Sequence, residues 1–247
     1  MQEGAFMRKL LGIVLILLSV HLWADDLQEG ITAYQQGDFE KAFNLLKPYE
    51  ISSNPEAHLN LAFMYFNGKG VNKDYSKAFS LFQSAATQGN KEAQYSLGYM
   101  YDEGYGAKQD FKQAFSWFKK AADQGHAQAQ LNLGIMYAQG RGTNQDYTHA
   151  ISLFKQAAEQ GQINALINLG LMYYKGYGVP QDYTQAFFWY KKAADQGDPQ
   201  AQFNVALMYS KEQGVKKNLT LAKEYFGKSC RGGMQKSCEG YALLDSK

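Results

Sequence analysis

The sequence contains few of the residues that bind metals in proteins. It has two cysteines and four histidines in 247 residues. His58, His126 and His149 are scattered, with no H-x-x-x-H pair and no cysteine and histidine cluster of ligand spacing outside the single cysteine pair. We therefore predict no metal site, and no motif indicates a cofactor.

An excess of one charge is also missing. The chain has 25 lysines and arginines against 23 aspartates and glutamates, a net charge of +2. Removal of a leader containing Arg8, Lys9 and Glu3 would leave a net charge near +1. No basic footprint for nucleic acid remains, so the sequence predicts no nucleic-acid binding.

The one marked hydrophobic run is short. It extends from Leu10 to about Leu22, after Arg8 and Lys9, and a small residue and two acids follow it. This length is short for crossing a bilayer, while the order of basic, apolar and small residues is typical of a secretory signal peptide. We predict a signal peptide at 1–24 and no stable membrane insertion after its cleavage; a core helix or a retained anchor is the alternative.

The sequence does contain a repeat with a period of 36 residues. The pentads LAFMY, LGYMY, LGIMY, LGLMY and VALMY begin at residues 61, 97, 133, 169 and 205. In 91–126 two apolar patterns have helical spacing, one from Ala93 to Tyr101 and one from Ala114 to Ala122. Each unit is therefore predicted to be a helical hairpin that needs its neighbours to bury both faces.

Start and stop signals flank these patterns. Asp110 is placed as an N-cap of the second helix, and Gly125 as the residue that ends it. The loop GYGAKQD between the helices contains two glycines, which adopt positive φ easily. Asn54 with Pro55, and Asp198 with Pro199, are start signals for first helices.

The pattern A-x-x-x-L-G-x-x-Y, then G-x-G, then D-Y/F-x-x-A and A-A-x-x-G resembles the Sel-1-like repeat family, a relative of the tetratricopeptide repeat. The resemblance implies an all-α, right-handed α–α superhelix. The fifth unit departs from the pattern at Glu212, at Asn218-Leu219 and at Ser229-Cys230. The predicted segments are a signal peptide at 1–24, a tetratricopeptide-like N-terminal hairpin at 25–54, repeats at 55–90, 91–126, 127–162, 163–198 and 199–234, and a C-terminal capping helix at 235–247.

The two cysteines lie close together at the C-terminal end. Cys230 and Cys238 flank a Gly-Gly turn, so they could face each other between antiparallel helices. A disulfide is the natural interpretation in a secreted chain, and a Cys-rich subgroup of the resembled family has pairs at this spacing. Two reduced, buried thiols are the alternative.

Catalytic motifs are incomplete. Ser116 with Lys119, and Ser152 with Lys155, fit the S-x-x-K nucleophile motif of serine β-lactamases, and the Cys-rich subgroup has been linked with penicillin binding. Neither K-T-G nor S-D-N occurs, and both pairs lie in the middle of predicted second helices. Each G-x-G lies between two helices, so it is no phosphate loop. We predict a protein that is not an enzyme, with β-lactamase-like activity as a remote alternative.

Asparagine recurs at one position of the first helices. The residue before the pentad is Asn60, Ser96, Asn132, Asn168 and Asn204 in the five units. Asparagine is a mediocre helix former, and its amide can pair with the backbone of an extended peptide. In peptide-binding tetratricopeptide proteins an asparagine at the matching place holds ligand backbone, so the resemblance implies a peptide groove. A plain solvated helix face is the alternative.

Apolar residues flank these asparagines and could form side-chain pockets or belong to the core. We select Tyr95 and Tyr99 as groove residues. Asp102 and Glu103 in one unit and Lys175 in another predict a ligand of mixed charge.

The function predicted from the sequence is a non-catalytic, exported adaptor that binds other proteins or extended peptide segments through a concave groove. The predicted signal peptide indicates a location in the periplasm or outside the cell, and the resemblance implies a bacterial protein with a role in assembling envelope or secreted complexes. The alternative is a periplasmic scaffold that binds cell-wall or exopolysaccharide machinery, or glycan.

Overall fold

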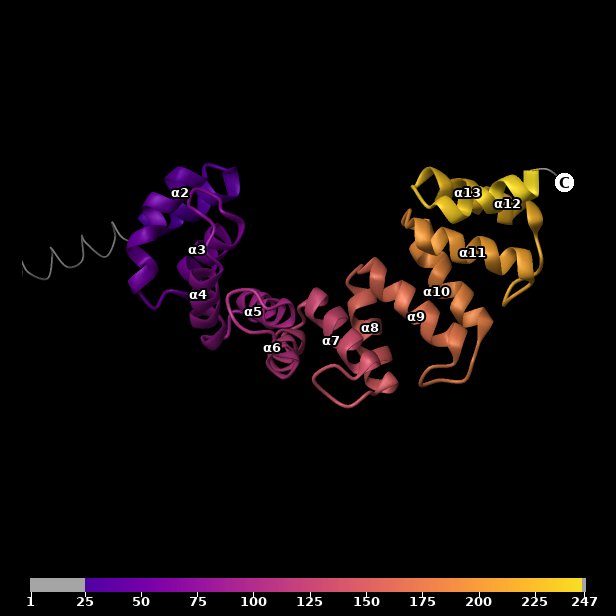
Figure 1. The fold of residues 1–247 in the computed structure, drawn as a ribbon, viewed down its shortest axis with the longest axis horizontal. Helices are drawn as coiled ribbons and strands as arrows, with labels where there is room; N and C mark the ends of the chain where they lie inside the picture. The colour runs from indigo at the N-terminus through magenta and orange to yellow at the C-terminus, as the bar shows by residue number, and fades with distance from the viewer. Residues whose placement is uncertain (1–24, 246–247) are drawn as a thin grey trace, which may run out of the picture. The chain divides into compact units, whose positions relative to one another are not determined.

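Every regular element in the described part of the chain is a helix. The computed structural model describes residues 25–245, and the predicted signal peptide at 1–24 lies outside this range. The all-α prediction is confirmed (Figure 1). Residues 25–36 are helical, and the elements after them are α2 (Phe39–Leu46), the 3-10 helix η1 (Lys47–Ile51), α3 (Pro55–Asn67), α4 (Tyr75–Thr87), α5 (Lys91–Glu103), α6 (Phe111–Asp123), α7 (Ala127–Gln139), α8 (Tyr147–Glu159), α9 (Ile163–Lys175), α10 (Tyr183–Asp195), α11 (Pro199–Lys211), α12 (Leu219–Arg231) and α13 (Gln235–Asp245).

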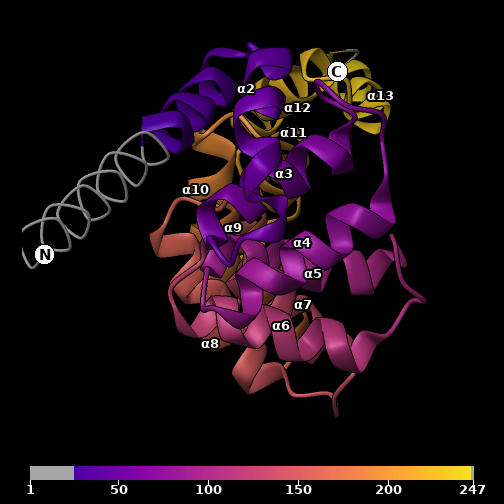
Figure 2. The ribbon, with the colours of Figure 1, turned by 90° about the vertical axis from the view of Figure 1, so that its left-hand side faces the viewer.

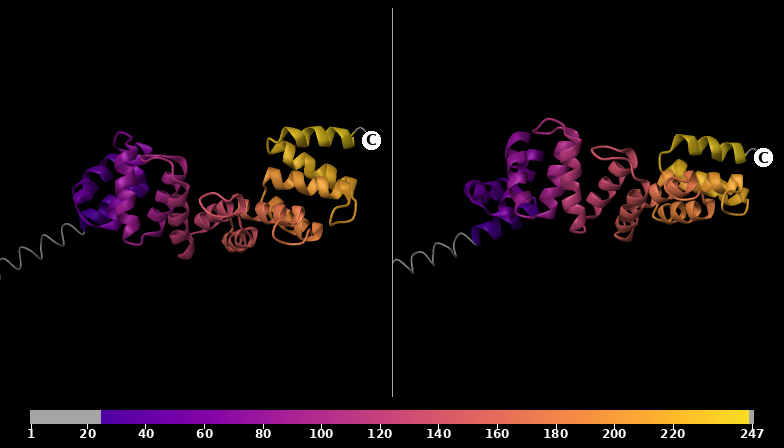
Figure 3. Two further views of the ribbon diagram at one scale, coloured as in Figure 1. Left: turned by 60° about the horizontal axis from the view of Figure 1, so that its bottom comes forward. Right: turned by 90° about the horizontal axis from the view of Figure 1, so that it is seen from below.

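The chain divides into two compact units after Trp117, within α6. In the first unit α3 packs against α4, and α4 packs against α5 (Figure 2). In the second unit each helix from α7 to α13 packs against the next, and α11, α12 and α13 lie side by side (Figure 3). The odd-numbered helices from α3 to α11 are the first helices of the repeats, and the even-numbered helices from α4 to α12 are the second helices.

The predicted caps are confirmed. The Asp110 carboxylate accepts hydrogen bonds from the backbone N–H groups of Lys112 and Gln113, at 2.9 and 3.1 Å, and so begins α6. The Asn54 side chain caps α3 in the same way. Gly125 follows α6 with a φ of +79°. These local signals explain why α3 and α6 begin, and α6 ends, where the repeat pattern predicts.

The two glycines of each loop have different roles. Gly104 ends α5 in the left-handed region, with a φ of +77°. Gly106 also has a positive φ, and a Cβ atom there would overlap the carbonyl oxygen of Tyr75, at the start of α4 in the preceding repeat. The second loop glycine therefore lets neighbouring repeats approach closely, whereas the first only ends a helix.

The fifth repeat shows this difference directly. Glu212 replaces the first glycine and still adopts the left-handed conformation, with a φ of +59°. Gly214, the second glycine, is retained, and a Cβ atom there would overlap the carbonyl oxygen of Tyr183. The departure predicted at residue 212 thus leaves the loop geometry intact at the cost of backbone strain.

The pentads form the seam between the two helices of a repeat. Leu169 and Met172 of α9 are buried. The glycine between them, Gly170, faces the Tyr190 ring of α10, and a Cβ atom there would lie 2.6 Å from that ring. Small residues at this position therefore allow first and second helices to pack closely.

Candidate functional site

The recurring asparagines divide between the two units. Asn60 belongs to the first unit, and Asn132, Asn168 and Asn204 belong to the second, on α7, α9 and α11. All four side chains are half-buried, whereas Ser96, which replaces the asparagine in the second repeat, is buried. The second unit therefore contains three asparagines at equivalent places on successive first helices.

Each of these amides is held by a partner one helical turn earlier. The Asn60 and Asn168 Nδ2 groups donate to the carbonyl oxygens of Glu56 and Asn164, both at 2.8 Å. The Asn132 Oδ1 accepts from Gln128 at 3.1 Å. In the same way, the Asn204 Oδ1 accepts from the Gln200 side chain at 3.3 Å.

These contacts use only part of each amide, which has two N–H donors and an oxygen with two lone pairs. The partners fix the orientation of the side chains, and hydrogen-bonding capacity remains for a ligand. The arrangement is suited to pairing with backbone amides.

A pocket of about 370 Å³ lies between α9 and α11. Ile167, Leu171 and Leu207 supply an apolar wall, and Tyr190 of α10 forms part of the floor. Burial, and secondarily the nearby Tyr174 hydroxyl, raises the pKa of Tyr190. The polar lining residues are Tyr174, Lys175, Gln200, Asn204 and Gln213.

A smaller pocket of about 180 Å³ lies between α3 and α5 in the first unit. Its lining is mostly aromatic and includes the two predicted tyrosines, Tyr95 and Tyr99. The Tyr99 ring lies 6.4 Å from the Phe66 ring, in an edge-to-face arrangement. Burial, followed by the charge of Glu103, raises the pKa of Tyr99.

A third pocket, of about 370 Å³, lies between α11 and α13. Phe203, Leu207 and Phe226 line it together with Leu243 of α13, whose side chain is 63% exposed. Leu207 also lines the pocket between α9 and α11, so these two pockets lie on opposite sides of α11.

The three pockets occupy the same position of the repeat. Phe63 and Phe82 in the first unit precede Leu171 and Tyr190 by three repeat lengths. Leu207 and Phe226 follow Leu171 and Tyr190 by one repeat length. A side-chain pocket between successive first helices is therefore a recurrent product of the repeat.

Of the apolar residues that flank the asparagines, some therefore line pockets and others belong to the core. Ile167 and Leu171 line a pocket, while Leu131, at the position equivalent to Ile167, is buried in the core. Sequence reasoning missed the residues that second helices contribute to the floor. Lys175 lines a pocket in the second unit, while Asp102 and Glu103 are in the first, and opposite charges at two points of one groove stay a prediction.

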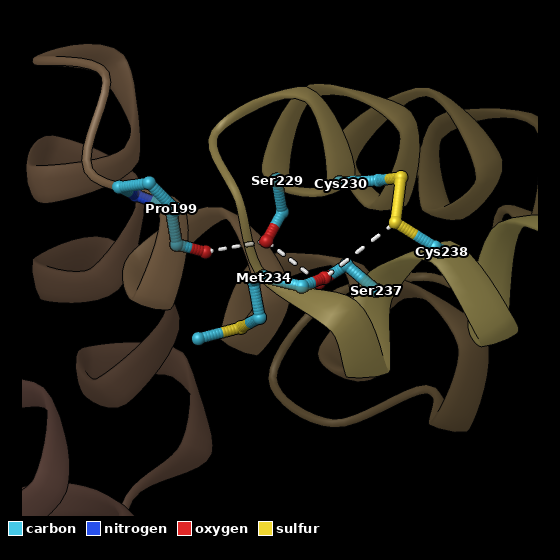
Figure 4. The surroundings of a disulfide bond; sticks show 6 residues. All are labelled: Pro199, Ser229, Cys230, Met234, Ser237 and Cys238. Atoms are coloured by element: carbon cyan, nitrogen blue, oxygen red, sulfur yellow. Dashed lines mark hydrogen bonds between the residues drawn. A yellow bond between two sulfur atoms is a disulfide. The ribbon is translucent and has the colours of Figure 1, made fainter.

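The C-terminal cap contains the predicted cysteine pair as a disulfide between α12 and α13 (Figure 4). The Cα atoms of Cys230 and Cys238 are 4.7 Å apart. Beside it, the buried Ser229 hydroxyl donates to the Pro199 carbonyl at 2.6 Å and lies 2.6 Å from the Ser237 hydroxyl. Ser229 of α12 therefore contacts both α11, through Pro199, and α13, through Ser237.

Lys119 of the first S-x-x-K pair is not placed as a base for serine activation. Ser116 and Ser152 lie on exposed faces of α6 and α8. Lys119 donates to Asp123 at 2.8 Å, and this hydrogen bond raises the pKa of Lys119. A lysine base for serine activation requires the opposite shift.

The described part of the chain contains no candidate metal site and no candidate membrane-spanning helix. Residues 25–245 contain no group of three histidine, cysteine, aspartate or glutamate side chains that could hold a metal ion. His58 is buried between the Tyr49 carbonyl and the Ser84 hydroxyl, at 3.1 and 2.8 Å. Over the same range, no helix has both the length and the apolar character needed to cross a membrane.

Two of the solved structures similar to this chain are Sel1-type repeat proteins from bacteria. Protein c5321 of uropathogenic Escherichia coli, described as a protective antigen with an SLR fold, is 33% identical with a TM-score of 0.83 over 87% of this chain. This chain covers 47% of that protein, about half of its length. A Sel1 repeat protein from Oxalobacter formigenes is 31% identical with a TM-score of 0.82, over 88% of this chain and 86% of that one.

Pseudomonas aeruginosa PilF shares only the fold, at 16% identity with a TM-score of 0.62, over 91% of this chain and 96% of that one. Among curated proteins, none matches significantly in sequence.

The Sel1 repeat model matches residues 55–90, 91–126, 127–162, 163–198 and 199–234, which together form most of the chain. Proteins of this kind generally mediate protein–protein interactions and are generally non-catalytic scaffolds. With five matched repeats and two solved structures above 30% identity, this chain belongs to the Sel1 repeat family.

Proposed function

We propose that this protein is an exported, non-catalytic adaptor that holds an extended segment of a partner protein on the first-helix face of its second unit. We define this face by α7, α9 and α11, with α13 at its end. The observation that carries the proposal is the repetition of polar and apolar sites on this face. Half-buried asparagine amides recur on its first helices, and side-chain pockets lie on both sides of α11.

The chemistry of the face is suited to an extended chain. A ligand in extended conformation leaves backbone N–H and C=O groups unpaired, and amides such as Asn168 and Asn204 can satisfy them. Ligand side chains can then enter the apolar pockets. Binding by this face requires no catalytic group, which agrees with the exposed positions of the Ser–Lys pairs.

Export is supported by two independent features of the chain. The predicted leader at 1–24 has the residue order of a signal peptide. The Cys230–Cys238 disulfide is of a kind that persists in oxidising compartments. Both features favour a periplasmic or secreted protein.

A comparative pull-down tests the adaptor proposal. The chain from residue 25 and a variant with Asn132, Asn168 and Asn204 changed to alanine are incubated with envelope and secreted fractions of the source cells. Bound proteins are identified by mass spectrometry. We expect a partner that the first protein captures and the variant loses at unchanged thermal stability.

The matched control changes the exposed amides Gln156 and Gln185 of α8 and α10 to alanine. This variant should retain the partner. Equal capture by all three proteins would place binding on another face. If all three proteins capture no partner, while the chain binds peptidoglycan fragments, the result would favour the glycan alternative.

A further inference from the structure

The two pockets beside α11 share one wall and differ in their charged residues. Lys175 is the charged side chain among the residues described for the pocket between α9 and α11. Lys236 and Glu239 line the pocket between α11 and α13. We name these the Lys175 pocket and the Lys236 pocket.

Lys175 is available for a ligand. Its ammonium group lies 5.7 Å from the centre of the Tyr174 ring, and the side chain is exposed. Across residues 25–245 no carboxylate forms an ion pair with it. An incoming carboxylate would therefore complement this pocket, whereas an incoming ammonium group would meet a like charge.

The distance between the pockets limits the ligand. They lie on opposite sides of α11, so their centres are separated by about the 10–12 Å diameter of a helix with its side chains. An extended chain advances about 3.3–3.6 Å per residue. Two side chains that fill both pockets are therefore about four residues apart, because side chains three apart in an extended chain point to opposite faces.

We infer that the partner segment is an extended acidic peptide with two large apolar side chains about four residues apart, one in each pocket. A glutamate or aspartate next to the residue in the Lys175 pocket pairs with Lys175. The side-chain amides of Asn204 and Gln200, at the rim of the same pocket, bind the backbone between the two anchors. This inference rests on the proposed adaptor function and specifies its ligand.

Defined synthetic peptides test the inference by fluorescence polarisation. Each is a fluorescein-labelled, C-terminally amidated 12-residue peptide of glycine and serine with two phenylalanines, either adjacent or three, four or eight residues apart. A glutamate or a lysine stands next to the first phenylalanine. The chain from residue 25 should prefer a spacing of four over the other three, with about tenfold weaker binding when one phenylalanine becomes serine. Glutamate should bind roughly fivefold more tightly than lysine.

Variants of the protein assign the two contacts. Lys175→Glu should reverse the preference between the glutamate and lysine peptides. Leu243→Glu, at a site that is 63% exposed, should weaken all two-anchor peptides by about tenfold and leave unchanged the peptides whose single phenylalanine stands next to the glutamate. Lys216→Glu, an exposed charge reversal outside both pockets, is the matched control and should change neither preference.

Binding that is independent of spacing, or a charge preference that survives Lys175→Glu, would overturn the inference. So would the absence of binding by every peptide. The pull-down with the triple asparagine-to-alanine variant tests the proposed function separately from the peptide assay. If the unmodified chain captures a protein partner that this variant loses, the adaptor proposal stands, but with a different ligand.

Discussion

Gln202 and Cys238 occupy the same position in successive repeats, and each links a first helix to the second helix before it. Gln202 does so by a hydrogen bond and Cys238 by a disulfide. The Gln202 side chain donates to the carbonyl oxygen of Ala194 at 3.4 Å, across the turn between α10 and α11. One repeat later Cys238 is bonded to Cys230, across the turn between α12 and α13. α13 is therefore placed as the first helix of a sixth, partial repeat.

The same glutamine hydrogen bond recurs in earlier repeats. The side chains of Gln94 and Gln130 donate to the carbonyl oxygens of Ala86 and Ala122, at 3.1 and 3.4 Å. All three glutamines are buried. A buried hydrogen bond thus fastens a first helix to the preceding second helix, and the disulfide replaces it at the C-terminal end.

Loss of the disulfide should loosen the cap. We expect Cys230→Ser with Cys238→Ser to lower the free energy of unfolding of the cap by about 2–3 kcal/mol, because the unfolded chain is no longer cross-linked. Cys230→Ala with Cys238→Gln should recover part of this loss, because the new glutamine can donate a hydrogen bond to the carbonyl oxygen of residue 230. Hydrogen exchange of the α13 amides, with and without reductant, measures the change. Equal protection of the α13 amides in both double variants would show that the introduced glutamine does not form this hydrogen bond.

The two loop positions of the fifth repeat should respond in opposite directions. Glu212→Gly should stabilise the protein by about 1 kcal/mol, because glycine adopts positive φ without strain. Gly214→Ala should destabilise it by more than about 2 kcal/mol, because the added Cβ overlaps the Tyr183 carbonyl oxygen. Urea unfolding of both variants measures the difference. Similar effects at the two positions would contradict the roles assigned to the glycines.

Core and surface positions of the second unit should differ sharply. Leu169→Ala removes a fully buried side chain and should cost about 2–5 kcal/mol. Lys155→Ala changes an exposed side chain and should cost less than about 0.5 kcal/mol. Thermal and urea unfolding check both values. A small effect of Leu169→Ala would argue against the placement of Leu169 in the interface between the two helices of the hairpin.

Tyr190 should make stability depend on alkaline pH. Burial raises its pKa in the folded protein above the unfolded value of about 10. Its contribution is therefore fully present below pH 10 and is lost as the pH rises from there toward the folded pKa. Tyr190→Phe should fold normally at neutral pH and lose less stability between about pH 10 and 12, as measured by urea unfolding at each pH. A pH dependence identical to that of the unmodified protein would show that another group is responsible.

The fold follows closely from local signals in the sequence. The apolar spacing, the N-cap at Asp110 and the glycine at Gly125 each predict a boundary that the structure confirms. These signals are local because capping and left-handed backbone depend on a few neighbouring residues. The distinct role of Gly106 was not predicted, since it arises from the approach of Tyr75 in another repeat.

Less of the candidate site than of the fold could be predicted from the sequence. Leu131 and Ile167 share a repeat position and an apolar side chain, yet one is buried in the core and the other lines a pocket. The hydrophobic pattern cannot separate them, because both environments favour the same residue types. Tyr190 comes from a second helix, so its place in the floor depends on packing between helices. The position of Leu243 could have been found by continuing the 36-residue register past Leu207.

Leu207 belongs to both pockets beside α11, and this shared wall has an evolutionary consequence. A substitution at Leu207 would alter both pockets at once, whereas a substitution at Ile167 or Leu243 would alter only one of them. Duplication or loss of a whole repeat would add or remove a pocket while leaving distant pockets unchanged. Selection for a longer or shorter partner segment would therefore act on the number of repeats, and selection for a different ligand side chain would act on the residues of one pocket.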